Sequence, residues 1–293
     1  MSDLSASAGR EGYGACDDEM AIINLADKFS QKVAERFALT SITDAFAGKD
    51  YDFSGVKTVK VYSVDVVDMN DYTRSGTNRF GELTELGDTV QELTLTRDRS
   101  FTYSIDKGND TQQFNIKAAT QCLKRQIDEV VTPELDIYRL GKWVAGAGLN
   151  GVHADLSKSN ILETIMTAGA EMSNALVPKG NRTLFIKESL YLQCKMAEQI
   201  IGVDKLGEKA LRDGSVGMLD GMKVVPVPDS YFPEGVNFLV KYKGATADPV
   251  QLKTYRVLTE QRGIDGDVVE GRIIYDSFVL DSRAKGLYVS KMA

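Results

Sequence analysis

The sequence predicts an α+β fold, in which a β-rich platform is interrupted by a long helix and by a second, mixed subdomain. Apolar and polar residues alternate with the period of strands in residues 56–106 and again near the C-terminus. Between these regions, apolar residues recur at helical spacing from Thr111 to Val144, and a mixed pattern follows to about residue 235. Strands and helices segregated along the chain favour α+β over a parallel α/β sheet.

The composition is that of an ordinary globular protein. The chain has 293 residues, of which 43% are hydrophobic and 26% are charged, so disordered, collagen-like and disulfide-scaffold proteins are excluded. No stretch reaches the roughly 18 apolar residues that cross a bilayer, and residues 1–19 lack the basic and then apolar regions of a secretory signal. We therefore expect a cytoplasmic location and no membrane.

The ionisable residues argue against several chemistries. Cys16, Cys122 and Cys194 are odd in number and far apart, which disfavours disulfides and a paired Cys-x-x-Cys zinc site. His153 is the single histidine, so catalysis would depend on carboxylates or lysines. The net charge of -7 opposes binding to DNA phosphates. We expect no metal and no cofactor.

Two N-terminal segments come first. Residues 1–19 are rich in Ser, Ala, Gly and acidic residues with almost no large apolar side chain, which predicts a mobile arm. An amphipathic helix with an apolar face follows, and Gly48 and Gly55 end this region. The apolar stripe of this helix consists of Leu25, Phe29, Val33, Phe37 and Leu39.

Residues 56–106 predict a long β-hairpin. Its alternating apolar residues are Val59 and Val61 in the first leg, and Leu93, Leu95, Phe101, Tyr103 and Ile105 in the second. The connection Asp68–Thr89 is longer than the roughly 12 to 15 residues usual for a structureless loop. A two-stranded ribbon is marginally stable alone, and legs of about twelve residues would reach about 40 Å. We therefore expect an arm that projects from its own body and is supported by another subunit.

A long helix follows a turn at Gly108 and Asn109. Its apolar stripe continues to Val144, and the glycines at 146, 148 and 151 end it. Pro133 lies inside this stretch, where a proline kinks or splits a helix. Thr132 is the expected cap of the second piece.

The rest of the chain predicts a mixed subdomain and a β-rich tail. Asn160 and Glu163 resemble a capping pair. The helix that they begin has a stripe of Ile161, Ile165, Ala168, Met172 and Ala175. A second helix is expected over Glu188–Ile201. Strands are expected over residues 182–186, 223–227, 237–242, 250–258, 268–280 and 286–290.

Two patterns near residue 150 suggest chemistry and have simpler explanations. Gly146–Gly151 has the glycine spacing of a dinucleotide fingerprint but follows a helix instead of a strand. His153, Asp155 and Ser157 could form a triad, although residues two apart in one segment rarely converge on one atom. We interpret the first as a helix-terminating loop and the second as a polar loop.

Acidic residues near the C-terminus are a third candidate. Asp265, Asp267 and Glu270 could bind a cation, but the spacing of a calcium loop is missing. We interpret them as a charged turn. A soluble acidic chain without a visible active site, bearing two extensions that need support, favours assembly with identical subunits.

Six segments, taken in order, resemble tailed-bacteriophage major capsid proteins of the Hong Kong 97 fold from Met20 to the C-terminus. They are AIINLADKFSQKVAERF, YDFSGVKTVKVYSV, MNDYTRSGTNRFGELTELGDTVQELTLTRDRSFTYSIDKGN, VVTPELDIYRL, GSVGMLDGMKVVPVP with YFPEGVNFLV, and VEGRIIYDSFVL. The resemblance implies an N-terminal arm (residues 1–35), an extended hairpin loop (56–106), a peripheral domain on a long spine helix (36–55, 107–149 and 241–293) and an axial domain (150–240).

The resemblance also implies a structural function. Such subunits form pentamers and hexamers that close into an icosahedral shell around double-stranded DNA, without sequence-specific binding. Assembly takes place in the host bacterial cytoplasm with scaffold, portal and decoration proteins. The loop residues expected to contact a neighbouring subunit are Asp68, Asn70, Asp71, Tyr72, Arg74, Arg79, Phe80, Glu82 and Glu85. Some members cross-link through a lysine in this loop, but none lies between Val61 and Asp106, so we expect no cross-link.

Two other functions remain open from the sequence. An encapsulin-like compartment has the same fold but encloses protein cargo, and the nucleic-acid content of particles would separate it from a phage shell. A carboxylate-based enzyme predicts a small oligomer with a concave acidic pocket, whereas a shell protein predicts very large assemblies.

Overall fold

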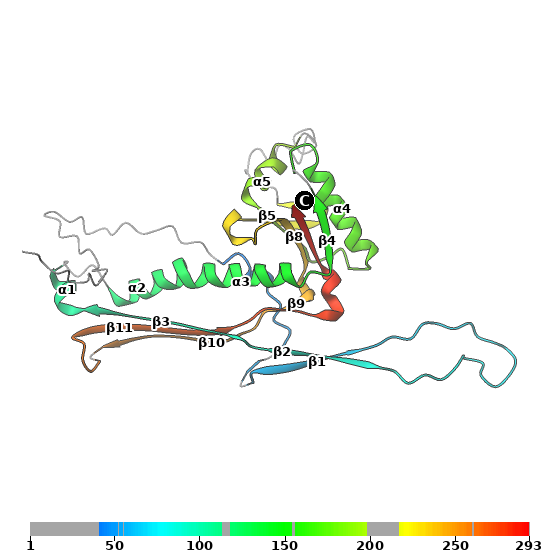
Figure 1. Ribbon diagram of the computed structural model, residues 1–293, viewed down its shortest axis with the longest axis horizontal. Helices are drawn as coiled ribbons and strands as arrows, with labels where there is room; N and C mark the ends of the chain where they lie inside the picture. Colours follow the sequence, from blue (N-terminus) through cyan, green and yellow to red (C-terminus); the bar gives the residue numbers. More distant parts are fainter. Residues whose placement is uncertain are drawn as a thin grey trace, which may run out of the picture. The chain divides into compact units, whose positions relative to one another are not determined.

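The computed structural model describes residues 41–51, 53–54, 56–112, 118–153, 156–197, 217–259 and 261–292. These residues form four sheets together with several helices (Figure 1), and the predicted α+β class is confirmed. The arm and the amphipathic helix predicted before residue 40 lie outside the described residues. No described helix is long and apolar enough to cross a membrane.

The predicted hairpin is shorter than expected. Strands β1 (Thr58–Val64) and β2 (Asp88–Thr94) pair antiparallel from Thr58↔Thr94 to Val64↔Asp88. The residues that we assigned to the rest of the second leg form a separate strand, β3 (Arg97–Asp106), which pairs with β11 instead. The legs therefore have seven residues each. The alternation of apolar residues is the same in both strands, so the sequence pattern does not reveal the change of partner.

A three-stranded antiparallel sheet lies under the long helix. Its order is β10 (Val250–Thr259), β11 (Gly266–Tyr275), β3. The helix consists of α2 (Ala119–Gln126), a π-helical turn η2 (Ile127–Val131) and α3 (Thr132–Ala145), and we call it the spine helix (Figure 1). Two apolar clusters join helix and sheet. One contains Ile105, Ala119 and Val269, and the other contains Leu135, Ile273 and Tyr275.

The helix continues through Pro133, where the sequence predicted a kink or a split, but its α-helical pattern is interrupted at Ile127–Val131. The π-helical turn before Pro133 widens the backbone where a proline lacks its N–H and crowds the preceding turn. Thr132 has helical dihedral angles, so its prediction as a cap is wrong. Gly108 and Asn109 lie in a short helix, α1 (Lys107–Gln112), and not in the predicted turn.

The mixed subdomain is built on a six-stranded sheet. Its order is β4 (Leu149–His153), β13 (Leu287–Met292), β8 (Val236–Tyr242), β5 (Arg182–Lys187), β7 (Met222–Val227) and β6 (Met218–Leu219). Helices α4 (Ile161–Asn174) and α5 (Glu188–Lys195) pack on one face, and the end of α3 packs on the other. Leu184 and Ile186 belong to the first core, while Phe185 belongs to the second.

The last strand joins this sheet. β13 pairs with β4 and with β8, so it does not lie with the other C-terminal strands as the expected range 241–293 placed it. Short elements lie outside the three-stranded and six-stranded sheets. β9 (Thr246–Ala247) pairs with β12 (Phe278–Val279). Turns of 3-10 helix lie at Asp44–Phe46, Asp229–Tyr231, Lys243–Ala245 and Asp281–Gly286.

Most other predicted elements are confirmed. Ile161, Ile165, Ala168 and Met172 are fully buried along α4. Asn160 precedes this helix as predicted, but its side chain accepts a hydrogen bond from the backbone N–H of Ser157 (2.7 Å) and makes no cap bond to the first turn. The helix predicted over 188–201 is seen as α5, and residues 198–201 lie outside the described part.

Candidate self-association surface

The base of the β1–β2 hairpin is fixed by a buried carboxylate. Asp276 accepts hydrogen bonds from the N–H and the hydroxyl of Thr96 (2.8 and 2.7 Å), from the Tyr138 hydroxyl (2.7 Å) and from the Ser277 N–H (2.8 Å). Thr96 lies between β2 and β3. These bonds therefore hold the point where the chain leaves one sheet for another, and tie it to the spine helix.

Apolar packing and one glutamine hold the rest of the base. Leu93 and Leu95 are buried with Phe53, Ala247 and Leu280. Gln91 donates to the carbonyl of Val279 (2.9 Å) and accepts from the N–H of Asp281 (3.0 Å). The hairpin thus begins from a rigid support.

Beyond this base the hairpin has little contact with the described residues. Lys60 and Glu92 pair across the strands at 2.8 Å with both side chains more than half exposed. The connecting loop, residues 65–87, contains large apolar side chains, and Val66 (93%), Met69 (99%) and Leu83 (103%) are exposed almost completely. Other exposed apolar residues of the hairpin and loop are Tyr62, Val64, Val67, Tyr72, Phe80, Leu86 and Val90. Exposed apolar side chains in this number make the hairpin and loop a candidate contact surface.

Backbone and ring contacts cross the loop, which Figure 1 draws as an irregular coil beyond β1 and β2. Its mouth is closed by a hydrogen bond from the Asp65 N–H to the Gly87 carbonyl (3.0 Å), and its tip by one from the Thr73 N–H to the Arg79 carbonyl (3.0 Å). The rings of Tyr72 and Phe80 meet edge to face at 5.0 Å. These cross-loop contacts present a formed apolar surface, which lowers the ordering cost of binding.

All nine loop residues predicted to contact a neighbour are exposed. The structure brings Tyr72 and Phe80 together, whereas Arg79 donates to the Gly76 carbonyl at the tip (3.1 Å). Among the described residues, no salt bridge involves Arg74, Glu82 or Glu85. Charge is segregated along the loop. Both arginines lie at the tip, and the acidic residues Asp65, Asp68, Asp71, Glu82, Glu85 and Asp88 flank it.

Sequence reasoning missed the apolar part of this surface. We selected mainly charged and polar residues, although the large apolar residues Val66, Val67, Met69, Leu83 and Leu86 are also exposed. The signal was present in the sequence, because large apolar side chains in a long connection that is otherwise polar have no core of their own to enter.

A second buried carboxylate, Asp248, binds residues next to the three-stranded and the six-stranded sheet. Ser277 follows β11, and Lys241 lies on β8. Asp248 accepts from the Trp143 indole N–H (2.8 Å), the hydroxyls of Thr246 (2.7 Å) and Ser277 (2.5 Å), and the Gly48 N–H (2.9 Å). Lys241 lies 3.4 Å away, with both side chains buried. Burial lowers the pKa of Lys241 to about 8 despite the opposing effect of Asp248. Burial alone would raise the pKa of Asp248, but Lys241 and the hydrogen-bond donors outweigh it and lower that pKa.

A third carboxylate holds the first described residues against the spine helix. Asp136 accepts from the Ser41 hydroxyl (2.8 Å), the Ile42 N–H (2.9 Å) and the Thr43 hydroxyl (2.5 Å). Arg139 donates to Thr43 at 3.2 Å. These buried acids were also missed, because nothing in the sequence separates them from the many exposed ones.

The three patterns considered for chemistry do not form catalytic sites among the described residues. Gly146–Gly151 connects α3 to β4, and a Cβ at Gly148 would lie 2.6 Å from the Ala284 carbonyl carbon, so packing explains the glycine. His153 contacts the Tyr288 hydroxyl (3.1 Å), Ser157 contacts Asn160, and Asp155 lies outside the described residues.

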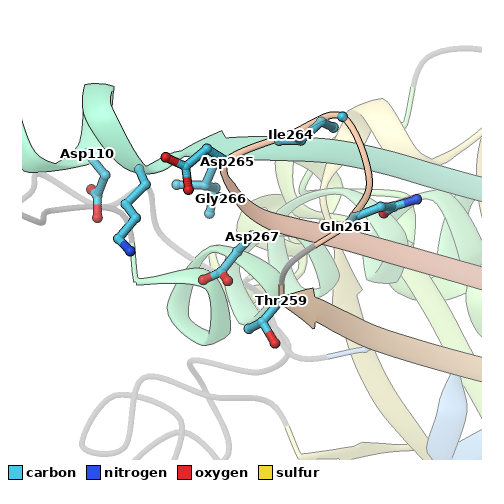
Figure 2. Close-up of a pocket in the computed structure, with 10 residues that line it drawn as sticks. Asp110, Thr259, Gln261, Ile264, Asp265, Gly266 and Asp267 are labelled. Carbon is cyan, nitrogen blue, oxygen red and sulfur yellow. The ribbon is translucent and has the colours of Figure 1, made fainter.

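A polar cavity of about 630 Å³ lies beside the β10–β11 turn (Figure 2). Asp110, Asp265 and Asp267 line it, and Lys107 lies among them. Glu270 is instead bound to Arg256 (2.8 Å), so the three acidic residues considered for a cation site do not converge. The described residues contain no group of three or more His, Cys, Asp or Glu that could hold a metal ion.

No protein-family model and no curated protein matches the chain. Solved structures do match it over nearly its whole length. They include the capsid of Cyanophage P-SCSP1u (11% identity, TM-score 0.72, 92% of this chain and 93% of that chain) and the mature capsid of bacteriophage PhiM1 (10%, 0.70, 92% and 92%). A chain described as Mycobacterium phage Che8 matches at 17% identity and TM-score 0.69, covering 91% and 96%. The chain has the Hong Kong 97 fold of tailed-phage capsid proteins. Within this fold, the spine helix and the extended loop that the resemblance implied are both present, the loop within shorter strands than expected.

Proposed function

We propose that this chain is a major capsid protein of a tailed bacteriophage. It associates with copies of itself into pentamers and hexamers, which close into an icosahedral shell around double-stranded DNA. The observation that carries the proposal is the loop of residues 65–87, whose large apolar side chains are exposed on a hairpin with a rigid base. The Hong Kong 97 fold over more than nine tenths of the chain supports it.

The proposed mechanism is geometric. Residues 65–87 of one subunit lie across its neighbour and bury Val66, Met69, Phe80 and Leu83 there. Arg74, Arg79, Glu82 and Glu85 pair with opposite charges at the rim, each worth about 0 to 1 kcal/mol. Burial of the apolar side chains contributes more, about 1.5 to 3 kcal/mol for each one that is fully buried. We also propose the division into arm, extended loop, peripheral domain and axial domain, with β13 assigned to the axial domain.

The remaining partners follow from this function. Scaffold, portal and decoration proteins would act with the shell, which would be assembled in the bacterial cytoplasm and end in the virion. The net charge of -7 suits a wall against which DNA is packed without adhesion. The function is structural and needs no catalysis and no cofactor.

A loop replacement tests the proposal. An Asn-Gly turn in place of residues 66–86 keeps the Asp65–Gly87 hydrogen bond and suits a two-residue hairpin connection. We expect unchanged thermal unfolding of the subunit and no closed particles by electron microscopy. The control Thr77→Ser, at the exposed tip of the same loop, should assemble normally.

The contents of the particles test whether the shell encloses double-stranded DNA. Double-stranded DNA in particles from phage-producing cells supports a capsid. Particles that hold only protein cargo would favour the encapsulin-like compartment, and normal particles from the loop replacement would refute the role of the loop.

A further inference from the structure

Thr96 is the residue at which the chain passes from the β1–β2 hairpin to the three-stranded sheet. The Leu95 N–H still donates to the Lys57 carbonyl at the base of the hairpin (2.9 Å), whereas Arg97 already pairs with Tyr275 of β11. Thr96 lies between these two pairings. A change in the backbone dihedral angles of Thr96 therefore changes the direction in which the hairpin leaves the body of the subunit.

Both hydrogen-bond donors of Thr96 bind the same oxygen of Asp276. The backbone N–H lies 2.8 Å and the hydroxyl 2.7 Å from Oδ2. The carboxylate is 1% exposed, and hydrogen bonds to a charged acceptor are stronger than those between neutral groups. Because hydrogen bonds are directional, the two bonds together hold both the backbone and the side chain of Thr96 in one orientation.

The carboxylate of Asp276 is held independently of the hairpin. Its other oxygen accepts hydrogen bonds from the Tyr138 hydroxyl on α3 (2.7 Å) and from the Ser277 N–H (2.8 Å). The Asp276 N–H donates to the Pro249 carbonyl (3.2 Å), and the Tyr138 ring meets the Tyr275 ring edge to face at 5.4 Å. The carboxylate is thus a fixed point between the spine helix and the hairpin.

The other contacts at the base hold the position of the hairpin more than its angle. Leu93 and Leu95 pack in an apolar cluster, and apolar packing has no preferred direction. Gln91 makes two hydrogen bonds, but it does so through a long side chain that has several rotamers. The bonds of Thr96 act on the backbone of the junction itself.

We propose that Asp276 is a positioning residue, which sets the angle of the hairpin against the spine helix. Strand β1 has seven residues and spans about 23 Å, so a tilt of about 10° at Thr96 moves the far end of the hairpin by about 4 Å. Such a displacement separates side chains that would otherwise be in contact. The inference rests on the proposed function, because the loop at that end has to reach the same place on every neighbouring copy.

Distances between two spin labels in the unassembled subunit test the angle. Nitroxides are attached to Asp88→Cys, at the end of β2, and to Lys124→Cys, on α2. Cys16 and Cys122 are replaced by serine in every variant, and Cys194 is buried. Double electron–electron resonance then gives the distribution of distances between the hairpin and the spine helix.

Thr96→Val removes one of the two bonds to Asp276 and keeps the shape of the side chain. We expect the distance distribution to shift or broaden by about 4 Å, and we expect closed particles to be lost in electron microscopy. Thr94→Val is the matched control. The Thr94 hydroxyl bonds to the Thr58 hydroxyl within the hairpin (2.9 Å), so its loss should leave the distribution unchanged. Thr96→Ser keeps the hydroxyl and should behave as the wild type.

Two tyrosines separate a positioning role from a contribution to stability. The Tyr138 hydroxyl binds Asp276, and the Tyr275 hydroxyl binds Glu134 (3.2 Å). Tyr138→Phe and Tyr275→Phe should therefore lower the melting temperature by similar amounts. Only Tyr138→Phe should broaden the distance distribution, because only the Tyr138 hydroxyl binds the carboxylate that holds Thr96.

The outcomes separate this inference from the proposed function, because the distance measurement does not require assembly. If the wild-type chain forms no shells, the proposed function fails, and the distances still test the role of Asp276. If Thr96→Val and Tyr138→Phe keep the wild-type distribution, or if both controls broaden it equally, Asp276 does not set the angle and the shell function is untouched. Normal shells from a Thr96→Val chain with a broadened distribution would contradict the need for a fixed angle.

Discussion

Replacing Asp248 with alanine tests whether this buried carboxylate holds the three-stranded and the six-stranded sheet together. The side chain is 2% exposed and accepts four hydrogen bonds, from Trp143, Thr246, Ser277 and Gly48. It also faces the Lys241 ammonium group at 3.4 Å. Within the described part of the chain, alanine removes the anionic partner of this buried cation and leaves several hydrogen-bond donors without an acceptor.

The expected loss is large. Removing one partner of a buried ion pair costs about 3 to 5 kcal/mol, because the remaining charge has lost its compensation. We therefore expect the free energy of unfolding to fall by about 4 kcal/mol, a large part of the stability of an ordinary domain. Replacing both partners, as in Asp248→Ala with Lys241→Met, should cost less than the single change, because no buried charge remains.

Urea unfolding measures this change in the free energy of unfolding directly. Trp143 is the only tryptophan and is fully buried against Lys241 and Asp248, so its fluorescence reports on the junction. Glu92→Gln, which breaks the exposed pair with Lys60, is the control and should leave the midpoint unchanged. A double variant that is less stable than Asp248→Ala, or an Asp248→Ala midpoint equal to that of the control, would refute the reasoning.

Three further changes have defined outcomes. Burial, opposed by Asp248, lowers the pKa of Lys241 from 10.5 to about 8 in the folded state. Between these pH values the unfolded state therefore binds more protons than the folded state, so the free energy of unfolding should rise with pH. Lys241→Met should remove this rise, as measured by urea unfolding at several pH values. Gly271→Ala should lower the melting temperature, because its Cβ would lie 2.3 Å from the Phe101 ring, whereas Gly180→Ala has open space and should not. Arg182→Met should cost about 3 kcal/mol in urea unfolding, because this buried guanidinium donates to three carbonyls and one hydroxyl at the end of α4.

Local periodicity predicted the elements better than it predicted their partners. The stripe of α4 and the strands β5, β7 and β8 could be read directly, because burial on one or both faces leaves a pattern in the sequence. The pairing partner of β3 could not be predicted in this way. Strands β2 and β3 are separated by only two residues, and the choice of β11 depends on residues 266–275, far along the chain.

The spine helix shows a related limit. A proline rule that considers only neighbours predicts a break at Pro133, but the π-helical turn before it lets the helix continue. The sequence also predicted the connecting loop by its length and polarity, as Asp68–Thr89, where the structure has residues 65–87. The apolar character of the proposed contact surface became evident only from the exposures of individual side chains, such as Leu83 and Met69.

The placement of polar groups explains how a marginal ribbon can act as an assembly element. Asp136, Asp248 and Asp276 each bind residues at least 90 positions away in the chain, and buried hydrogen bonds to a charged acceptor are among the strongest available. They fix the base of the hairpin and its surroundings before any partner arrives. The loop can then leave its apolar groups exposed, because the stability of the subunit does not depend on burying them. Since a two-stranded ribbon gains little from its own pairing, the proposed contact with another subunit is where burial of the apolar side chains of the loop would contribute most of its free energy.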